Sequence, residues 1–435
     1  MKSVLQPRPD WPFDIRRIPF FYGWVIWLLS TLGFLFSIPG QTMGMAVFTD
    51  HLMEALGLSR TQLSMAYLVG TVGSSLFLTR AGRWYDRLGG RLMVALASLA
   101  LGLMLLFISA TGSFAGAFGG GPVASFFFIM VGYFGVRFFG QGVLTSASAN
   151  VLLLWFEKRR ALVCSIRGVF VSLGFSLAPL GLAWLIAASD WRVALWQLAV
   201  ACMVFSVAAH LLLRNNPDSC GVKIDGRSDE EHAASNNLVD SATLEQARRS
   251  PVFWLISLSL SMHSLFATAV TFHIVSIFNE AGRSATEAFA YFLPAAIVST
   301  ATNLYAGWLA DSRSLKPFMV VMLVGFIIGA LGLVNLHTEQ GYWLLVAGFG
   351  VGSGLWSITS NLAFIRNFGP LHLGEITGLC SAIMVFASAI GPAMFSLGLD
   401  AFGTYAAAEW LCIGALVCLV VAAVLIPHKN EQIPL

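Results

Sequence analysis

The sequence predicts an all-α membrane protein with twelve transmembrane helices in two pseudo-symmetric six-helix bundles. Three observations lead to this fold class: the composition, the spacing of the apolar runs and an internal repeat. The 435 residues are 57% hydrophobic and 11% charged, with a mean hydropathy of +0.77. Soluble domains average roughly 25% charged residues, so this chain has too little polar surface to be one. Its formal charge of +3 gives no indication of nucleic-acid binding.

The apolar residues form runs of the length that a membrane requires. A hydrocarbon core about 30 Å thick takes roughly 20 apolar residues per helix. The chain divides at its charges and turns into twelve such runs, six on each side of one polar stretch. The predicted spans are 21–48, 61–80, 92–111, 124–153, 161–187, 193–213, 252–278, 285–309, 317–336, 341–365, 374–398 and 404–426.

The polar stretch at 214–250 is the predicted linker between the two bundles. In it, Thr243 with Gln246 three residues later has the pattern of a capping box, which predicts a helix that leads into span seven at Pro251. The N-terminus is basic but has no small-residue cleavage site, so we expect a retained first span. The expected parts are an N-terminal segment (1–20), a first bundle (21–213), the linker (214–250), a second bundle (251–427) and a tail (428–435).

The distribution of Lys and Arg predicts the orientation. If both termini are cytoplasmic, 20 of the 25 cations lie on that side. The external loops then hold Arg60, Arg192 and Arg283, and Arg137 and Arg167 lie within spans. Because cytoplasmic loops are enriched in Lys and Arg, we expect a multi-pass protein of the cell's inner or plasma membrane with both ends inside.

The two halves of the chain repeat one another. At an offset of 225 residues, Gly57 and Ser59 correspond to Gly282 and Ser284. At the same offset GRWYDRLGGR (82–91) corresponds to GWLADSRSLK (307–316). A glycine-rich loop in the first half, TGSFAGAFGGGPV, then lowers the offset to about 212, where SAN (148–150) matches TSN (359–361). Two parallel six-span halves around a central site are a transporter architecture.

These motifs resemble those of the major facilitator superfamily. GRWYDRLGGR is similar to the family's signature loop between spans two and three, with Trp84 and Tyr85 where the family prefers Leu-Ala. GWLADSRSLK is similar to the second copy of that loop. RFFGQG in span four is similar to the family's Arg-containing motif, with one extra residue before Gln-Gly. The resemblance covers essentially the whole chain.

Within that superfamily, four motifs resemble the monocarboxylate and oxalate/formate porter branch. They are FFYGW, LGLSRTQ, WFEKRRA and SPVFW. The resemblance implies a monocarboxylate or related organic anion as the solute. Neither span eight nor span eleven contains the cation that anion carriers of the branch often hold. A neutral or drug-like solute therefore stays open as the alternative.

The signature loops predict a cytoplasmic gate. Asp86, Arg87 and Arg91 can pair with span eleven or with helix N-termini, and such pairs form in one conformation and break in the other. The positive-inside rule accounts for the arginines, but it does not account for Asp86, for Gly82 or for the second copy. The predicted gate residues are Gly82, Asp86, Arg87, Gly89, Arg91, Gly307 and Asp311.

A second set of residues is predicted to face the solute pathway. An arginine at mid-span is costly, so Arg137 marks a function unless neighbouring carbonyls satisfy it structurally. Gln141, Thr145 and Ser148 follow Arg137 at helical spacing and predict a polar stripe on one helix face. The histidines of span seven can carry a proton or can be hydrogen-bonded core residues. The aromatic candidates can instead serve packing. The predicted pathway residues are Arg137, Gln141, Gln41, Asn361, His263, His273, Tyr67 and Trp356.

The predicted function is a secondary active transporter that moves a small organic solute by alternating access. The chain has no phosphate-binding loop with Lys-Ser/Thr, and no HExxH or GxSxG motif, so we expect neither ATP-driven transport nor an enzyme. We expect no cofactor, no metal and no nucleic acid. The expected partners are the solute, the lipid bilayer and the proton as a candidate coupling ion, and we expect a monomer. A transport-dead solute sensor with the same fold is a further alternative.

Overall fold

The computed structural model describes residues 11–226 and 241–427. Residues 1–10, 227–240 and 428–435, which belong to the predicted N-terminal segment, linker and tail, lie outside this part. Helices dominate the described residues, and ten of them are long and apolar enough to cross a membrane. The two remaining predicted spans are also helical, but their helices α4 (Arg60–Leu88) and α15 (Phe292–Ala310) are less apolar. They are the corresponding second spans of the two halves.

Contacts between residues divide the chain into two compact units. Unit 1 comprises Met1–Glu157, Phe170–Val239 and Leu371–Ala382, and unit 2 comprises Lys158–Val169, Asp240–Pro370 and Ile383–Leu435. Each unit therefore includes a short segment from the other half of the sequence. These segments are the first turns of α9 (Arg160–Ala188) and α18 (Leu373–Phe402).

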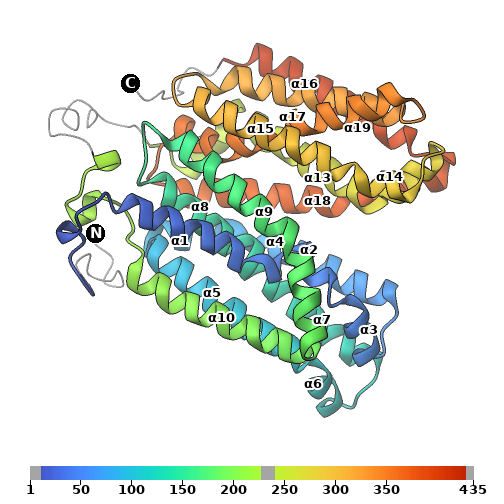
Figure 1. Cartoon of the computed structure of the whole chain (residues 1–435), viewed down its shortest axis with the longest axis horizontal. Helices are drawn as coiled ribbons and strands as arrows, with labels where there is room; N and C mark the ends of the chain where they lie inside the picture. The colour runs from blue at the N-terminus through green and yellow to red at the C-terminus, as the bar shows by residue number, and fades with distance from the viewer. Residues whose placement is uncertain (1–10, 227–240, 428–435) are drawn as a thin grey trace. The chain divides into compact units, whose positions relative to one another are not determined.

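Unit 1 is a bundle of packed helices. In it α5 and α10 lie side by side, as Figure 1 shows. Helix α4 packs on α7. Its helices outside α4, α9 and α18 are α1 (Gly23–Phe36), α2 (Thr42–Ala46), α3 (Thr49–Leu56), α5 (Gly90–Ser109), α6 (Thr111–Ala117), α7 (Pro122–Val136), α8 (Thr145–Leu153) and α10 (Trp191–Leu212).

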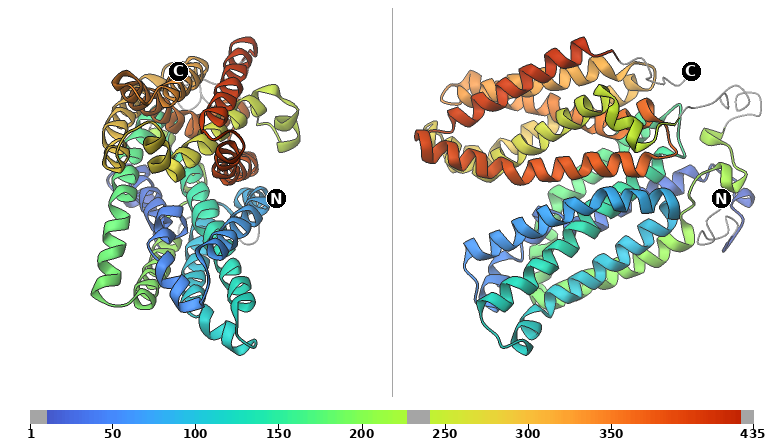
Figure 2. Two further views of the ribbon diagram at one scale, coloured as in Figure 1. Left: turned by 90° about the vertical axis from the view of Figure 1, so that its right-hand side faces the viewer. Right: turned by 180° about the vertical axis from the view of Figure 1, so that it is seen from behind.

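Unit 2 has α17 against both α15 and α16, with α19 on the other side of α16. These orange and red helices run alongside one another in Figure 1 and Figure 2. Its helices outside α15, α9 and α18 are α12 (Leu244–Arg249), α13 (Pro251–Glu280), α14 (Ala285–Ala290), α16 (Leu315–Val334), α17 (Glu339–Phe368) and α19 (Ala406–Leu425). The predicted capping box is confirmed: Thr243 Oγ1 accepts from Gln246 N at 3.3 Å, and Gln246 Oε1 accepts from Thr243 N at 2.8 Å.

The first predicted span, 21–48, is not one continuous helix. Helix α1 ends at Phe36, a single 3₁₀ turn η2 (Ile38–Gly40) follows, and α2 begins at Thr42. Pro39 explains the break because it has no N–H to donate to the preceding turn. The backbone N–H groups of Gly44 and Met45 both bond to the Gln41 carbonyl. The Gly40 carbonyl is thus left without a helical partner in this turn and is available to a side chain.

The fourth predicted span, 124–153, contains a π-helical stretch that the sequence analysis did not predict. Helix α7 leads into η3 (Arg137–Leu144), which has π-type hydrogen bonding, and α8 continues from Thr145. An extra residue inserted into an α-helix is accommodated by widening one turn in this way. The RFFGQG motif, one residue longer than the family motif that it resembles, lies entirely within the π stretch. The expected α-helical spacing of the polar stripe after Arg137 was therefore wrong.

Two further predicted elements differ in detail. Span eight, 285–309, is divided into α14 and α15 at Tyr291, three residues before Pro294, which has no N–H to donate to the preceding turn. The glycine-rich segment expected to be a loop begins as α6 and becomes irregular only at Gly119, Gly120 and Gly121, all with positive φ.

The repeated Gly-x-Ser motif begins the second span of each half. Gly57 and Gly282 have φ values of +62° and +76°, and each ends a turn in the left-handed region that glycine permits. Ser59 then forms a capping box with Gln62, and Ser284 forms the same reciprocal pair of bonds with Glu287. The duplicated letters therefore specify a helix start rather than a solute contact.

Candidate functional site

A polar cluster surrounds Arg137 inside unit 1. The side chain is 3% exposed, and its Nη1 donates to the Gly40 carbonyl at 3.2 Å and to Thr42 Oγ1 at 3.3 Å. Its guanidinium carbon lies 5.3 Å from the centroid of the Tyr67 ring, and the Tyr67 hydroxyl donates to Thr42 Oγ1 at 2.9 Å. All these partners are neutral. Within the described residues, Arg137 Nε is buried without a hydrogen-bond partner.

The cluster exists because the break in span one packs against the π stretch of span four. A Cβ atom on Gly40 would lie 2.7 Å from Gly140 Cα and 2.4 Å from the Val136 carbonyl oxygen. Only glycine at these positions allows the two backbones to approach so closely. This contact presents the Gly40 carbonyl to Arg137.

The two amides predicted to accompany Arg137 lie in the same unit. Gln41 caps α2 and its Nε2 donates to Ser37 Oγ at 3.1 Å. Gln141 lies in the π stretch, and its Oε1 is buried without a hydrogen-bond partner in the described structure. The hydroxyl of Thr145 bonds to the Gln141 backbone carbonyl and so turns away from the amide. Arg137, Gln41, Tyr67 and Gln141 therefore belong to one unit, with unused donors and acceptors among them.

In unit 2, His263 and Trp356 lie together. Their ring centroids are 4.6 Å apart, and His263 Nε2 lies 3.2 Å from Ser353 Oγ. Trp356 Nε1 donates to the Leu260 carbonyl at 3.2 Å, which ties α17 to α13. His263 Nδ1 is buried without a hydrogen-bond partner in the described residues. His273 lies ten residues further along α13, in a separate group with Ser396 and Tyr405.

Asn361 contacts a helix of its own unit rather than other predicted pathway residues. Its Oδ1 accepts from Arg167 Nη2 at 2.6 Å. At the corresponding position of the first half, Asn150 Nδ2 donates to Thr377 Oγ1 at 3.0 Å. Asn150 of span four thus bonds to the start of α18, and Asn361 of span ten bonds to the start of α9. In each case the helix comes from the other half of the sequence. This repeated contact was not predicted, although SAN and TSN were recognised as a match.

Asp86 lies at the start of α18. Its two carboxylate oxygens accept from the backbone N–H groups of Gly374 at 2.8 Å and Glu375 at 2.9 Å. A carboxylate at a helix N-terminus is favoured by the free N–H groups and the helix dipole. Burial nevertheless raises the pKa of Asp86 to about 6, because the desolvation of the charged form outweighs the two backbone hydrogen bonds. Arg83 adds an ion pair to Glu375 at 2.8 Å.

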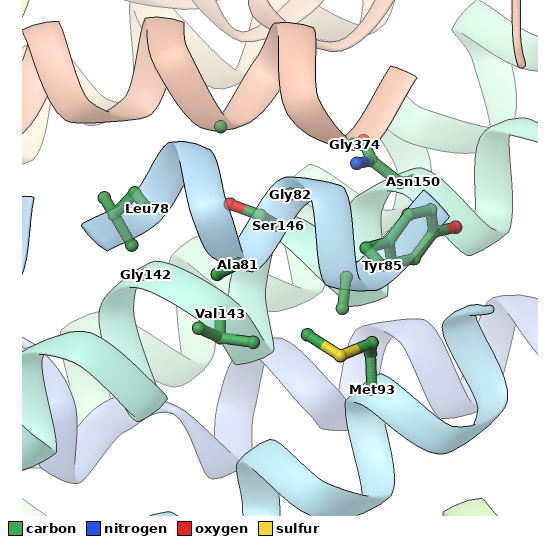
Figure 3. Close-up of a pocket in the computed structure, with 12 residues that line it drawn as sticks. Leu78, Ala81, Gly82, Tyr85, Met93, Gly142, Val143, Ser146, Asn150 and Gly374 are labelled. Carbon is green, nitrogen blue, oxygen red and sulfur yellow. The ribbon is translucent and has the colours of Figure 1, made fainter. Parts of the chain in front are cut away.

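Gly82 makes this contact possible. A Cβ atom on Gly82 would lie 2.0 Å from the Gly374 carbonyl oxygen, and one on Gly378 would lie 2.7 Å from the Leu78 carbonyl oxygen. Helices α4 and α18 therefore cross at backbone contact over one full turn. Figure 3 shows Gly82 on α4 below the start of α18, at a cavity of about 20 Å³. A cavity of this size has room for one water molecule.

The second copy of the motif makes the corresponding contact in unit 2. Asp311 accepts from the backbone N–H groups of Ala161 at 2.7 Å and Leu162 at 3.1 Å, at the start of α9. A Cβ atom on Gly307 would lie 1.9 Å from Ser165 Oγ. Burial raises the pKa of Asp311 as it does that of Asp86. The duplicated Gly and Asp thus serve the same local geometry twice.

The remaining predicted gate residues are placed differently. Gly89 has a φ of +83° and forms the turn between α4 and α5, and Arg87 is exposed at the end of α4. The Arg91 guanidinium donates to the carbonyls of His210 at 2.6 Å and Trp11 at 2.8 Å. These carbonyls lie at the C-terminal end of α10 and in the N-terminal segment. The physical reason is that cations are favoured at helix C-termini.

Sequence reasoning missed several residues that complete these contacts. Gly374, Glu375 and Thr377 form the start of α18, and Asn303 packs beside Ser165 in unit 2. A signal was present for one of them, since Gly374 and Gly378 are four residues apart and can face one neighbouring helix. The partner helix could not be deduced because the contacts join residues nearly 300 positions apart.

Apolar helical spans, two repeated halves and buried polar clusters define a multi-pass membrane transport protein. A family model of the Major Facilitator Superfamily matches residues 29–392. The chain therefore belongs to this superfamily, and it is an integral membrane transporter.

Known proteins support the same assignment. The chain is 22% identical over 364 residues to a probable hexose phosphate transport protein of Chlamydia muridarum, covering 76% of this chain and 73% of that one. Among solved structures, the proton:xylose symporter XylE has a TM-score of 0.69 at 16% identity, covering 95% of this chain and 98% of its own. The human organic anion transporter MFSD10 has a TM-score of 0.64 at 13% identity, with coverages of 92% and 99%. These likenesses show the fold.

Proposed function

We propose that the protein is a secondary active transporter that recognises a small organic anion through Arg137 and moves it by alternating access. The observation that carries the proposal is the buried guanidinium of Arg137, whose partners Gly40, Thr42 and Tyr67 are all neutral. A solute carboxylate or phosphate would supply the missing negative charge and a partner for Arg137 Nε.

A cation at mid-span costs about 2.5–3.5 kcal/mol in insertion assays and more in simulations. Two long hydrogen bonds and one cation–π contact return only part of this cost. An anion that pairs with Arg137 during transport offsets the rest, which gives a reason for keeping the residue.

The chemical class of the solute is part of the proposal. The Chlamydia muridarum relative bears the name of a hexose phosphate transport protein, and MFSD10 is described as an organic anion transporter. Both descriptions fit an anionic solute. The monocarboxylates implied by the porter-branch motifs fall in the same class, and phosphorylated sugars extend it. XylE and the E. coli fucose:proton symporter FucP, which is 15% identical with a TM-score of 0.61, bear the names of sugar–proton symporters and keep a neutral solute as the alternative.

The duplicated helix-end contacts form the proposed cytoplasmic gate. The bonds from α18 to Asp86 and from α9 to Asp311 link segments from opposite halves of the sequence, as a contact that opens and closes requires. We include Gly82, Gly89 and Gly307, which permit the close backbone geometry, and the cations Arg87 and Arg91. We also propose cytoplasmic termini, following the cation distribution, and a monomer.

Ligand-dependent thermal stabilisation of the purified protein tests the solute class. Monocarboxylates, dicarboxylates, sugar phosphates, neutral sugars and drug-like amines are compared at equal concentration. The expected result is that an anion raises the unfolding temperature of the wild type and not that of Arg137→Ala. Stabilisation by the same anion in Arg137→Ala contradicts the role of Arg137, and stabilisation by neutral sugars alone supports the alternative. Binding without flux in proteoliposomes identifies a sensor.

A further inference from the structure

A chain of hydrogen bonds runs from the exposed Ser276 of unit 2 to one ring nitrogen of His273. The exposed Ser276 lies 3.0 Å from the Tyr405 hydroxyl oxygen, which lies 3.3 Å from His273 Nδ1. On the other side of the ring, Nε2 lies 3.0 Å from the Pro392 carbonyl oxygen and 3.3 Å from Ser396 Oγ. The ring also stacks on Phe395, with centroids 6.5 Å apart.

The Pro392 carbonyl fixes the state of one ring nitrogen. A carbonyl oxygen can only accept, so Nε2 carries a hydrogen in both the neutral and the charged ring. The nitrogen that can gain or lose a proton is then Nδ1, which faces the hydroxyl of Tyr405.

The hydroxyl chain satisfies both states of Nδ1. With a neutral ring, Tyr405 donates to Nδ1 and Ser276 donates to Tyr405. With a protonated ring, Nδ1 donates to Tyr405, and Tyr405 donates to Ser276. When a proton arrives at Ser276, that oxygen passes its own proton to Tyr405, and Tyr405 passes its own to Nδ1. Each oxygen gains and loses one proton, and the imidazole becomes imidazolium without losing a hydrogen bond.

Ionisable groups lie on the elements around His273. The elements packed around it contribute acids: Glu280 on α13, Asp400 near the end of α18 and Glu409 in the first turn of α19. The Glu280 carboxylate accepts from Thr404 Oγ1 at 2.5 Å and from the backbone N–H of Tyr405 at 3.3 Å, so it is joined to the same turn. Glu409 is 3% exposed. Tyr405 is the remaining titratable neighbour, and Arg283, the cation at this end of α13, is bonded to Glu287 and Glu339.

We infer that His273 Nδ1 is the binding site for a coupling proton, which reaches it through Ser276 and Tyr405. The inference rests on the proposed transport function and adds the residue that carries the proton. His263, the other histidine of α13, has no such chain: among the described residues its Nδ1 is buried without a partner.

The direct test is nitrogen NMR of histidine side chains in the full-length protein in nanodiscs, without solute. His273→Gln identifies the His273 signal, and His337→Gln, at an exposed position, is the matched control. We expect the His273 signal to report an unprotonated Nδ1 at high pH and a protonated Nδ1 when the pH is lowered. Tyr405→Phe removes the hydroxyl that accepts from Nδ1 and relays the proton. We expect this variant to keep Nδ1 unprotonated at a pH at which the wild type has it protonated. An Nδ1 that stays unprotonated throughout overturns the inference.

A transport measurement separates this inference from the proposed function. In proteoliposomes, an imposed pH gradient is expected to drive accumulation of the anion in the wild type and in His337→Gln. His273→Gln is expected to lose this accumulation while its unfolding temperature stays near that of the wild type. Accumulation at the wild-type level in His273→Gln contradicts the proton site. If the wild type shows no flux of any solute, the transport proposal fails, and the NMR titration still decides whether His273 binds the proton.

Discussion

Replacing Gly82 by alanine is expected to open the contact between α4 and α18. A Cβ atom at this position would lie 2.0 Å from the Gly374 carbonyl oxygen and 2.5 Å from its carbon, both backbone atoms that cannot rotate away. Ordinary contact requires more than 3 Å, so the start of α18 must move by more than about 1 Å. The bonds from Asp86 to Gly374 and Glu375, now 2.8 and 2.9 Å, would then exceed the length of a hydrogen bond.

The loss can be estimated from these two bonds. A hydrogen bond to a charged group contributes about 1.5–3 kcal/mol, so their combined loss is about 3 kcal/mol or more, roughly a hundredfold in the open-to-closed ratio. The assay is maleimide labelling of Cys380, the native thiol of α18 in unit 1, which is 2% exposed, with the other five cysteines replaced. We expect Gly82→Ala to speed labelling roughly a hundredfold.

Gly181→Ala is the matched control, because it also adds a methyl group within a helix but meets no atom within 4 Å. It should label at the wild-type rate. If Gly82→Ala labels no faster than Gly181→Ala, the close helix crossing does not hold the proposed gate closed, and the reasoning is refuted.

Three more predictions concern other contacts of unit 1. The pKa of Asp86 is about 6 when it is bonded to α18 and near its ordinary value of 3.8 when it is released, so the bonded form holds a proton more strongly. Acidification from pH 7 to 5 should therefore slow Cys380 labelling by at most tenfold per pH unit, once the rate is normalised to that of the unfolded protein. Asp86→Asn should show no such pH dependence. Asn150→Ala removes the bond to Thr377 and should raise the labelling rate about fivefold, for about 1 kcal/mol; an unchanged rate would show that this bond does not restrain α18. Ser59→Ala removes the cap of α4, about 1 kcal/mol, and should speed hydrogen exchange in its first turn about fivefold; unchanged exchange would contradict the capping role.

Composition and periodicity were sufficient for the fold class, because a lipid-exposed helix must satisfy its own backbone and must be apolar along about 20 residues. The exceptions occur where proline or an inserted residue interrupts that rule. Pro39 breaks span one, and the extra residue in RFFGQG coincides with the π stretch of span four. Both interruptions meet at Arg137, the residue whose burial had already marked the site.

Pairing between distant helices could not be read from a single sequence. The repeat identified Asp86 and Asp311 as equivalent, but the helix starts that they contact are set by tertiary packing. The same limit explains Arg91, whose charge indicated a partner but not which helix end supplies it. The separation of His263 from His273 into two clusters depends on neighbours from α17, α18 and the loop before α19.

The central claim is that Arg137 recognises an anionic solute that this protein carries across the membrane. Counterflow in proteoliposomes tests it directly, with the stabilising anion inside and its labelled form outside. The account predicts rapid exchange in the wild type and loss of exchange in Arg137→Gln, which has a polar amide but no charge. Exchange at the wild-type rate in Arg137→Gln would contradict the claim.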